Sequence, residues 1–301
     1  MGIIEVKNLQ KSFKVKTKKI KALDGLSFDV KNGEIYGFLG PNGAGKSTTI
    51  KIIMDLIRAD DGYVKIFDKL STDYKAREKV GFMPENPQYY DNLSGYDLLM
   101  MSAGIFKMDK VKAERRSWEL LELFELKDSA KKLIRKYSKG MIQRIGFASA
   151  IIHEPELLIL DEPMSGLDPL GRVLFKNIMK ELNSKGVTIF FSSHIIPDIE
   201  EICSKVILIK SGKIVQELDS IEIKHLSTFG FQIIVKKNNL QNIDFPLREI
   251  SNDLISIDVS KQDFPQLINR LKDLSVEIVD IIPIKNSLED IFLNTLKKDK
   301  I

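Results

Sequence analysis

The stretch Gly40-Pro41-Asn42-Gly43-Ala44-Gly45-Lys46-Ser47 decides the fold, because it matches the pattern G-x-x-x-x-G-K-[ST]. Glycines at this spacing let the backbone turn its N–H groups toward phosphate oxygens. The apolar run Glu34–Leu39 precedes the loop, and helical apolar spacing over Thr49–Ile57 follows it. We therefore expect a strand, the loop, and a helix whose N-terminus is itself an anion site.

Two side chains of this loop carry the predicted chemistry. Lys46 is expected to pair with the β- and γ-phosphates of a nucleotide, and the Ser47 hydroxyl is expected to face Mg²⁺. The residues expected to bind the nucleotide are Gly40, Pro41, Asn42, Gly43, Ala44, Gly45, Lys46, Ser47 and Thr48. The motif by itself indicates a P-loop nucleotide hydrolase or kinase.

An acidic pair, Asp161-Glu162, follows the apolar run Leu157–Leu160. Two solvated turn carboxylates would explain such a pair, but a P-loop needs an aspartate at a strand end for its metal ion. Asp161 is therefore predicted to hold Mg²⁺. Glu162 is predicted to orient or deprotonate the water that attacks the γ-phosphate.

Three further motifs give the chain its resemblance to ATP-binding cassette (ABC) ATPases. Residues Pro163–Asp168 resemble the D-loop, Tyr137–Met141 resemble the signature sequence LSGGQ, and Phe191–His194 resemble the switch-histidine motif. The motifs stand in the family's order over residues 1 to about 220. The Tyr-Ser-Lys-Gly-Met variant and the tail segment Ser287–Leu293 are similar to the bacterial ABC-2-type export subfamily.

The resemblance implies a composite site between two cassettes related by twofold symmetry. Ser138 would cap a helix whose N-terminal dipole faces the γ-phosphate of ATP held by the other protomer. Gly140 and the D-loop residue Asp168 would belong to the same nucleotide-binding set. The second cassette is a copy of this chain or another ABC ATPase.

Two more roles come from the same resemblance. His194 would contact the γ-phosphate and hold Glu162 and the attacking water in place, so the catalytic set is Glu162, His194 and Lys46. Phe13 would stack on adenine; the alternative is that it is an ordinary apolar side chain.

The chain departs from the family pattern at two places. Gly81–Glu85 resembles the Q-loop, but Glu85 stands where glutamine is usual; it can bind the metal shell, yet an ionised carboxylate cannot donate a hydrogen bond. In the signature, Lys139 and Met141 replace glycine and glutamine. Lys139 would either direct its charge to the γ-phosphate or point to solvent.

The resemblance implies a fold and a domain division. The expected fold is an α/β ABC ATPase core with a mixed, mainly parallel sheet, an antiparallel β subdomain and a helical subdomain, plus a small C-terminal α/β appendage. The ATP-binding domain would span residues 1–220, with its helical subdomain at about 86–153, and the accessory domain would span 221–301.

Periodicity and turn signals predict the individual elements. The basic segment Lys14–Lys21 is expected to be a solvated hairpin tip, and Ser94 is expected to cap a helix together with Asp97. A last helix would open at Ser287. The other expected strands are Ile3–Leu9, Ala22–Val30, Tyr63–Phe67, Val80–Met83, Val187–Phe191, Phe231–Val235, Leu254–Val259 and Val276–Ile282, with a hairpin over Lys205–Leu218 and helices near Pro169 and over Gln262–Leu274.

The composition of the chain argues against several classes of partner and structural feature. The 301 residues carry a net charge of +4 with acids and bases interspersed, so no nucleic-acid partner is expected. The single cysteine, Cys203, excludes a disulfide within the chain. No signal-peptide pattern is visible at the N-terminus. No apolar run approaches the roughly 20 residues that span a bilayer, so another chain would have to supply a pore.

The predicted function is therefore an ATP-hydrolysing subunit that drives an integral membrane permease from the cytoplasmic side of the membrane, with export as the expected direction. Its cofactors would be ATP and Mg²⁺. Tyr89, Tyr90, Leu93 and Met100 are candidates for the groove that receives the permease, or they only pack the helical subdomain. The alternative function is a soluble ABC ATPase acting as a regulatory, ribosome-associated or nucleic-acid-associated factor.

Overall fold

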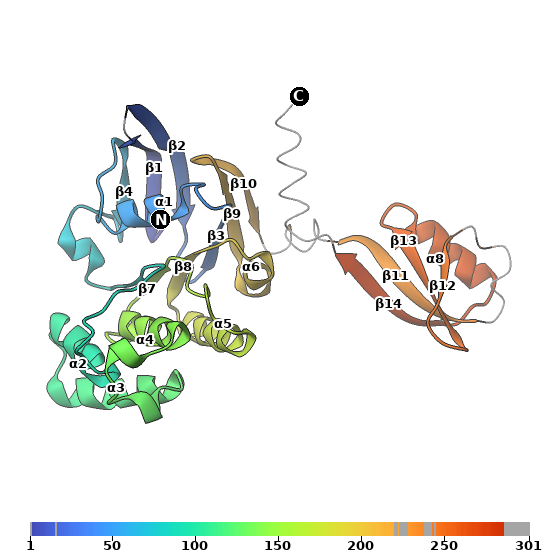
Figure 1. Cartoon of the computed structure of the whole chain (residues 1–301). Helices are drawn as coiled ribbons and strands as arrows, with labels where there is room; N and C mark the ends of the chain where they lie inside the picture. The colour runs from blue at the N-terminus through green and yellow to red at the C-terminus, as the bar shows by residue number, and fades with distance from the viewer. Residues whose placement is uncertain are drawn as a thin grey trace. The chain divides into compact units, whose positions relative to one another are not determined.

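The computed structural model describes residues 2–15, 17–219, 222, 228–237, 243 and 245–285 (Figure 1). The chain divides into two compact units, Met1–Asp219 and Ser220–Ile301. This division lies one residue from the boundary expected from the sequence. The helix expected at Ser287, and with it the tail segment Ser287–Leu293, lies outside the described residues.

A six-stranded sheet forms the centre of the first unit. Its neighbouring strands are parallel except for the pair β9 and β10. All residues of the three central strands are buried, as predicted for parallel strands covered on both faces. In spatial order the strands are β10 (Lys213–Asp219), β9 (Lys205–Lys210), β3 (Ile35–Leu39), β8 (Thr188–Ser193), β7 (Leu157–Leu160) and β6 (Val80–Met83).

Parallel strands bring their carboxyl ends to one edge of the sheet. The loops that follow β3, β6, β7 and β8 therefore meet there, although they are far apart in the sequence. These loops carry the phosphate-binding motif, Glu85, the acidic pair and His194. The topology thus gathers four sequence motifs at one place.

A separate antiparallel sheet has the order β2-β1-β4-β5. Its first strand is longer than expected, because residues 10–15 stay paired with the following strand, with Phe13 opposite Ile20. The described lysines Lys14, Lys18 and Lys19 near the turn are exposed, as predicted for a hairpin tip. The strands are β1 (Ile4–Val15), β2 (Lys18–Val30), β4 (Asp61–Ile66) and β5 (Lys69–Leu70).

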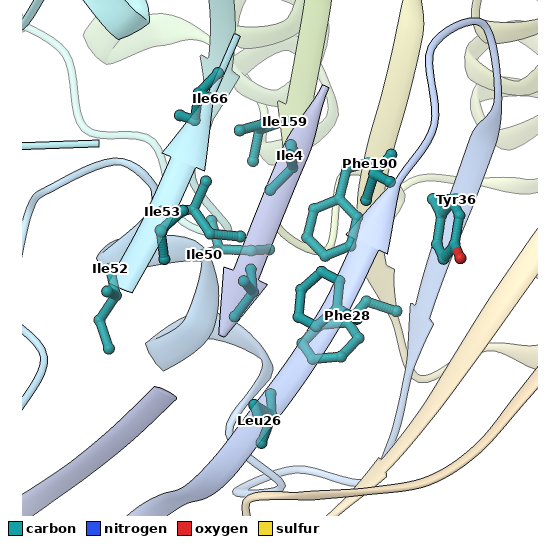
Figure 2. Packing of buried hydrophobic residues seen from close by; sticks show 14 of the residues in the cluster. Ile4, Leu26, Phe28, Tyr36, Ile50, Ile52, Ile53, Ile66, Ile159 and Phe190 are labelled. Atoms are coloured by element: carbon teal, nitrogen blue, oxygen red, sulfur yellow. The ribbon is translucent and has the colours of Figure 1, made fainter. Parts of the chain in front are cut away.

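One hydrophobic core joins this sheet to the central sheet (Figure 2). The ring centroids of Phe28 and Phe190 lie 5.7 Å apart in a stacked arrangement. Ile50 and Ile53 come from α1 (Lys46–Ile53), the helix that begins within the phosphate loop. The helix ends before the expected Ile57 because Met54 already leaves the helical conformation.

The helical subdomain contains α2 (Gly95–Ile105), α3 (Lys110–Leu123) and α4 (Lys139–Ile151). The sequence predicts a helical pattern from Asn86, but residues 86–94 are not helical. The first helix begins only after its N-cap residue, Ser94. The predicted capping box of Ser94 and Asp97 is present.

The remaining helices of the first unit connect the motifs. Two α-helices, α5 (Pro169–Ser184) and α6 (Ile196–Ile202), follow the D-loop and His194 respectively, and α6 was not predicted. Phe175 of α5 packs edge-on against Phe124 and Phe147 of the helical subdomain. Short 3₁₀ turns lie at Tyr74–Arg77, Lys127–Ser129 and Ile134–Lys136.

In its described part, the second unit contains an antiparallel sheet and the helix α8 (Phe264–Asp273). Leu267 and Leu271 of the helix are buried in one cluster with Ile233 and Ile257 of the sheet. In spatial order the strands are β12 (Leu247–Glu249), β13 (Leu254–Ser260), β11 (Thr228–Lys236) and β14 (Ile278–Lys285). Within the described part of both units, no helix combines the length and the apolar character that crossing a bilayer requires.

Candidate functional site

A cavity of about 390 Å³ lies where the carboxyl ends of the central strands meet. Its walls come from the phosphate loop, the Q-loop, Glu162 of the acidic pair, the D-loop and the switch-histidine segment. The lining residues are Ala22, Pro41, Asn42, Gly43, Gly45, Lys46, Ser47, Thr48, Glu85, Glu162, Ser165 and His194. The fold therefore brings together residues from five separate sequence motifs.

The phosphate loop has the backbone that its glycines predict. Gly45 has φ +111°, and a Cβ there would meet Leu23 at 2.7 Å and the Ala22 carbonyl oxygen at 2.9 Å. Only glycine fits such a position. Nζ of Lys46 donates to the carbonyl oxygen of Gly40 at 2.6 Å. The loop thus wraps around its own lysine and keeps that charge at the cavity.

Asp161 is buried at the end of β7 and accepts two hydrogen bonds on Oδ1. The donors are the hydroxyls of Ser192, at 2.7 Å, and Ser47, at 3.1 Å. Burial raises the pKa of Asp161, while the two hydroxyl bonds act in the opposite direction. The predicted metal ligands Ser47 and Asp161 are therefore in contact with each other.

Glu162 is the centre of the site. Its Oε1 lies 3.1 Å from Nζ of Lys46, and its Oε2 lies 2.8 Å from Nδ1 of His194. Its backbone has φ +48°, a left-handed conformation that is uncommon for residues other than glycine. Glu162 as a whole residue is 6% exposed. Glu162, His194 and Lys46 thus form one connected set.

Glu85 lines the same cavity, as its place in the Q-loop predicts. Its carbonyl oxygen accepts a hydrogen bond of 3.0 Å from Nε2 of Gln143, a buried residue of α4. The Q-loop is therefore tied to the helix that begins at the signature sequence.

The oxygen donors at the cavity fit Mg²⁺. Serine and aspartate oxygens are hard ligands, and Mg²⁺ is usually held by one or two carboxylates together with substrate phosphates and water. Across the described residues, no three His, Cys, Asp or Glu side chains gather as a metal-binding cage. Ser47 and Asp161 therefore suit a metal ion that shares its coordination with a phosphorylated substrate.

Ser138, Gly140 and Asp168 do not line this cavity. The Ser138 hydroxyl caps α4 by accepting the Met141 N–H at 3.3 Å. The Asp168 carboxylate caps α5 by accepting the Gly171 N–H at 2.9 Å. Ser138 and Gly140 belong to the signature segment, which by the resemblance would face the ATP of another cassette, and Asp168 belongs to the D-loop.

Lys139 is exposed at the start of α4, so the course toward solvent that the sequence analysis considered stays open. Its Cε lies 2.6 Å from the position that a Cβ on Gly166 would occupy, so its side chain lies along the D-loop of the same chain. Gly166, with φ +77°, has no side chain that would clash with the side chain of Lys139.

Phe13 is also absent from the cavity lining. Its ring is 40% exposed on β1, with Nζ of Lys11 lying 5.6 Å from the ring centroid. Its contact with adenine stays a prediction.

Sequence reasoning missed three residues at the site. Ser192 stands in the switch-histidine motif, but a serine on a buried strand gives no sign of which groups it will contact. Ala22 reaches the cavity from β2, more than twenty residues before Lys46. Ser165 was visible only as part of the D-loop.

Comparisons with known proteins place the chain in a family. Residues 23–165 match the family described as ABC transporter. The bacitracin transport ATP-binding protein BcrA of Bacillus licheniformis is 36% identical, with 92% of both chains covered. The linearmycin resistance ATP-binding protein LnrL of Bacillus subtilis is 35% identical over 71% of this chain and 68% of its own length.

A solved structure gives the same result for the fold. It is a dimer of the ATP-binding cassette MJ0796 in a post-hydrolysis state, bound to ADP and phosphate. It superimposes with a TM-score of 0.67 and 25% sequence identity, over 72% of this chain and 98% of that chain.

Proposed function

This chain belongs to the ABC transporter family as an ATP-hydrolysing, ATP-binding subunit, and we propose that it drives export through a separate membrane permease. The connected set Lys46, Glu162 and His194 carries the proposal for the chemistry. A cation, a carboxylate and an imidazole meet at a phosphate-binding loop, which is the combination that in-line attack of water on a γ-phosphate needs.

We assign each of these side chains one role. Lys46 binds the β- and γ-phosphates, since its ammonium is held at the mouth of the loop. Glu162 accepts the proton of the attacking water, and His194 keeps the carboxylate turned toward that water. Mg²⁺ held by Ser47 and Asp161 would neutralise charge on the phosphates.

Ser138 completes the site from a facing cassette. Its helix, α4, presents an N-terminus capped by the serine, and a helix N-terminus is an anion site. Ser138 lies outside the cavity of its own chain, which supports its supply by a second cassette. ATP would then hold the two cassettes together, and hydrolysis would release them.

Export is supported by two of the relatives. Their names refer to bacitracin transport and to linearmycin resistance, and removal of a toxic compound is transport out of the cell. The same names favour a transporter subunit over a soluble ABC ATPase with a regulatory or ribosomal role. We therefore place the chain at the cytoplasmic face of a membrane, bound to the permease.

Among the residues considered for the permease contact, Tyr90 is the best suited. Its side chain is 68% exposed and it follows Glu85 closely in the chain. Tyr89 is half-buried against Gly146 of α4, and burial raises the pKa of its hydroxyl. Leu93 and Met100 are half-buried as well, so they pack the subdomain rather than form an open surface.

The variant Glu162→Gln tests the chemistry. It should bind ATP, form an ATP-dependent dimer on size exclusion, and release phosphate roughly 10²–10⁴-fold more slowly than the wild type. Phosphate release at the wild-type rate would refute the assignment of Glu162.

Tagged Glu162→Gln protein, purified from solubilised membranes with ATP, tests the partner. A multi-span membrane protein should co-purify, and Tyr90→Ala in the same background should reduce its amount. Tyr74→Ala is the matched control, since Tyr74 is 67% exposed and belongs to the 3₁₀ turn Tyr74–Arg77, which is not part of the helical subdomain. Recovery of ribosomal proteins in place of a membrane protein would favour the soluble alternative.

A further inference from the structure

We infer that Ser192 is a positioning residue for hydrolysis, because its one hydroxyl fixes both members of the acidic pair. Its oxygen donates to Oδ1 of Asp161 at 2.7 Å and accepts the backbone N–H of Glu162 at 2.9 Å. The inference rests on the roles proposed above for Asp161 and Glu162.

The position of Ser192 follows from the sheet. β7 and β8 are parallel, with Leu160 opposite Phe191, so the next residues along are Asp161 and Ser192. Ser192 is fully buried. The Ser192 side chain therefore reaches from β8, the strand that leads to His194, to the acidic pair that follows β7.

Only a hydroxyl performs both tasks at this point. A serine oxygen offers one donor and two acceptor lone pairs, so it can bond a carboxylate and an amide N–H at once. Alanine offers neither bond, and an unbonded buried amide or carboxylate is unfavourable. Without the Ser192 hydroxyl, the Asp161 carboxylate would lose one hydrogen-bond donor and the Glu162 N–H would lose its acceptor.

Each bond has a separate consequence. The bond to Asp161 acts together with the one from Ser47, so two donors converge on Oδ1 and fix the rotation of the carboxylate. Such outer partners orient the groups that bind a metal ion. The bond from the Glu162 N–H holds the backbone at φ +48°, which directs the carboxylate between Lys46 and His194.

The neighbouring serine has another task. The hydroxyl of Ser193 accepts the Ile195 N–H at 2.9 Å, in the turn that leads into α6. The two serines of the switch-histidine motif thus have separate roles. Ser192 forms hydrogen bonds with the acidic pair, and Ser193 stabilises the turn after the strand.

The test compares Ser192→Ala, Ser192→Thr and Ser204→Ala. Ser204 is the matched control, because its hydroxyl likewise donates one hydrogen bond, to the Ile35 carbonyl oxygen at 3.0 Å, and accepts one, from the Ile35 N–H at 3.2 Å, near the opposite end of β3. The measurements are kcat and KM for ATP, the affinity for Mn²⁺ in the presence of ADP by electron paramagnetic resonance, and the thermal midpoint.

For Ser192→Ala we expect kcat and Mn²⁺ affinity to fall roughly 10–100-fold, with KM for ATP nearly unchanged. Ser192→Thr, which keeps the hydroxyl, should recover most of both losses. Ser204→Ala should lower the thermal midpoint as much as Ser192→Ala does but keep the wild-type kcat and Mn²⁺ affinity.

Two results would overturn the inference. Wild-type kcat and Mn²⁺ affinity in Ser192→Ala would do so, and so would equal losses of kcat in Ser192→Ala and Ser204→Ala, which would indicate a purely structural effect. The Glu162→Gln variant distinguishes a failure of the inference about Ser192 from a failure of the proposed hydrolysis chemistry. If that variant is inactive while Ser192→Ala is normal, the inference about Ser192 fails alone; if it is active, the proposed chemistry fails.

Discussion

Nδ1 of His194 lies 2.8 Å from Oε2 of Glu162. The two residues end neighbouring parallel strands, β8 and β7, and so reach each other across 32 residues of sequence. The Glu162 side chain is 8% exposed and the His194 side chain is 44% exposed. The imidazole is thus the solvent-facing end of the pair, where it can meet a bound phosphate.

The first prediction concerns this contact. His194→Ala should lower kcat roughly 10²-fold or more with a smaller effect on KM, since the carboxylate loses the group that orients it. His194→Gln should keep part of the activity, because its amide can donate to the same oxygen. Steady-state phosphate release measures both, and an unchanged kcat in the alanine variant would contradict the role of His194.

The second prediction concerns the composite site. Ser138→Arg and Glu162→Gln should each be inactive alone. When the two proteins are mixed in equal amounts, mixed dimers contain one intact site, so about a quarter of wild-type activity should return if the sites work independently. Mixing either variant with itself is the control. No recovery in the mixture would argue against Ser138 acting on the partner's nucleotide.

The third prediction concerns a buried ion pair between the helices that follow the D-loop and His194. The Asp198 carboxylate of α6 lies 3.7 Å from Arg172 and 3.7 Å from Lys176, both in α5. Asp198→Asn should lower the free energy of unfolding by about 1–3 kcal/mol, because it removes the charge that these cations face in a buried setting.

The control for Asp198 is a surface pair on α5. Lys185 and Glu181 are joined at 2.6 Å but remain more than half exposed. Glu181→Gln should therefore change the free energy of unfolding by less than about 0.5 kcal/mol. Equal changes in the free energy of unfolding for the two substitutions, measured by urea denaturation, would show that burial does not strengthen the contribution of Asp198 to stability.

The fourth prediction concerns pH. Burial lowers the pKa of His153, whose ring stacks on Phe106, from 6.5 to about 4. Between these two values the unfolded chain binds a proton that the folded protein does not, so acidification favours unfolding. The stability that neutral His153 contributes is present above pH 6.5 and is lost as the pH falls toward 4.

His153→Gln is the comparison for this effect. Its thermal midpoint should decline less than that of the wild type between pH 6.5 and 4, since the glutamine does not titrate. Parallel declines of the two midpoints over this interval would contradict the prediction.

The sequence alone predicted the P-loop, the buried parallel strands and the family. The reason is that these features depend on local rules: glycine spacing, the uninterrupted apolar run Leu157–Leu160, and the cap formed by Ser94 and Asp97. Element ends were less accurate. Residues 10–15 continue β1 because the hairpin pairs them, and a polar strand held by its neighbour has no apolar pattern of its own.

Tertiary structure alone decided how these motifs are connected. That Ser192 holds both acids, that Lys139 lies along the D-loop at Gly166, and that Gln143 ties α4 to Glu85 all depend on strand register and helix placement. These contacts join residues up to 58 positions apart, and a side chain's type does not state which distant group the fold will set beside it. The sequence determined which chemistry is present, and the parallel register of β7 and β8 decided its geometry.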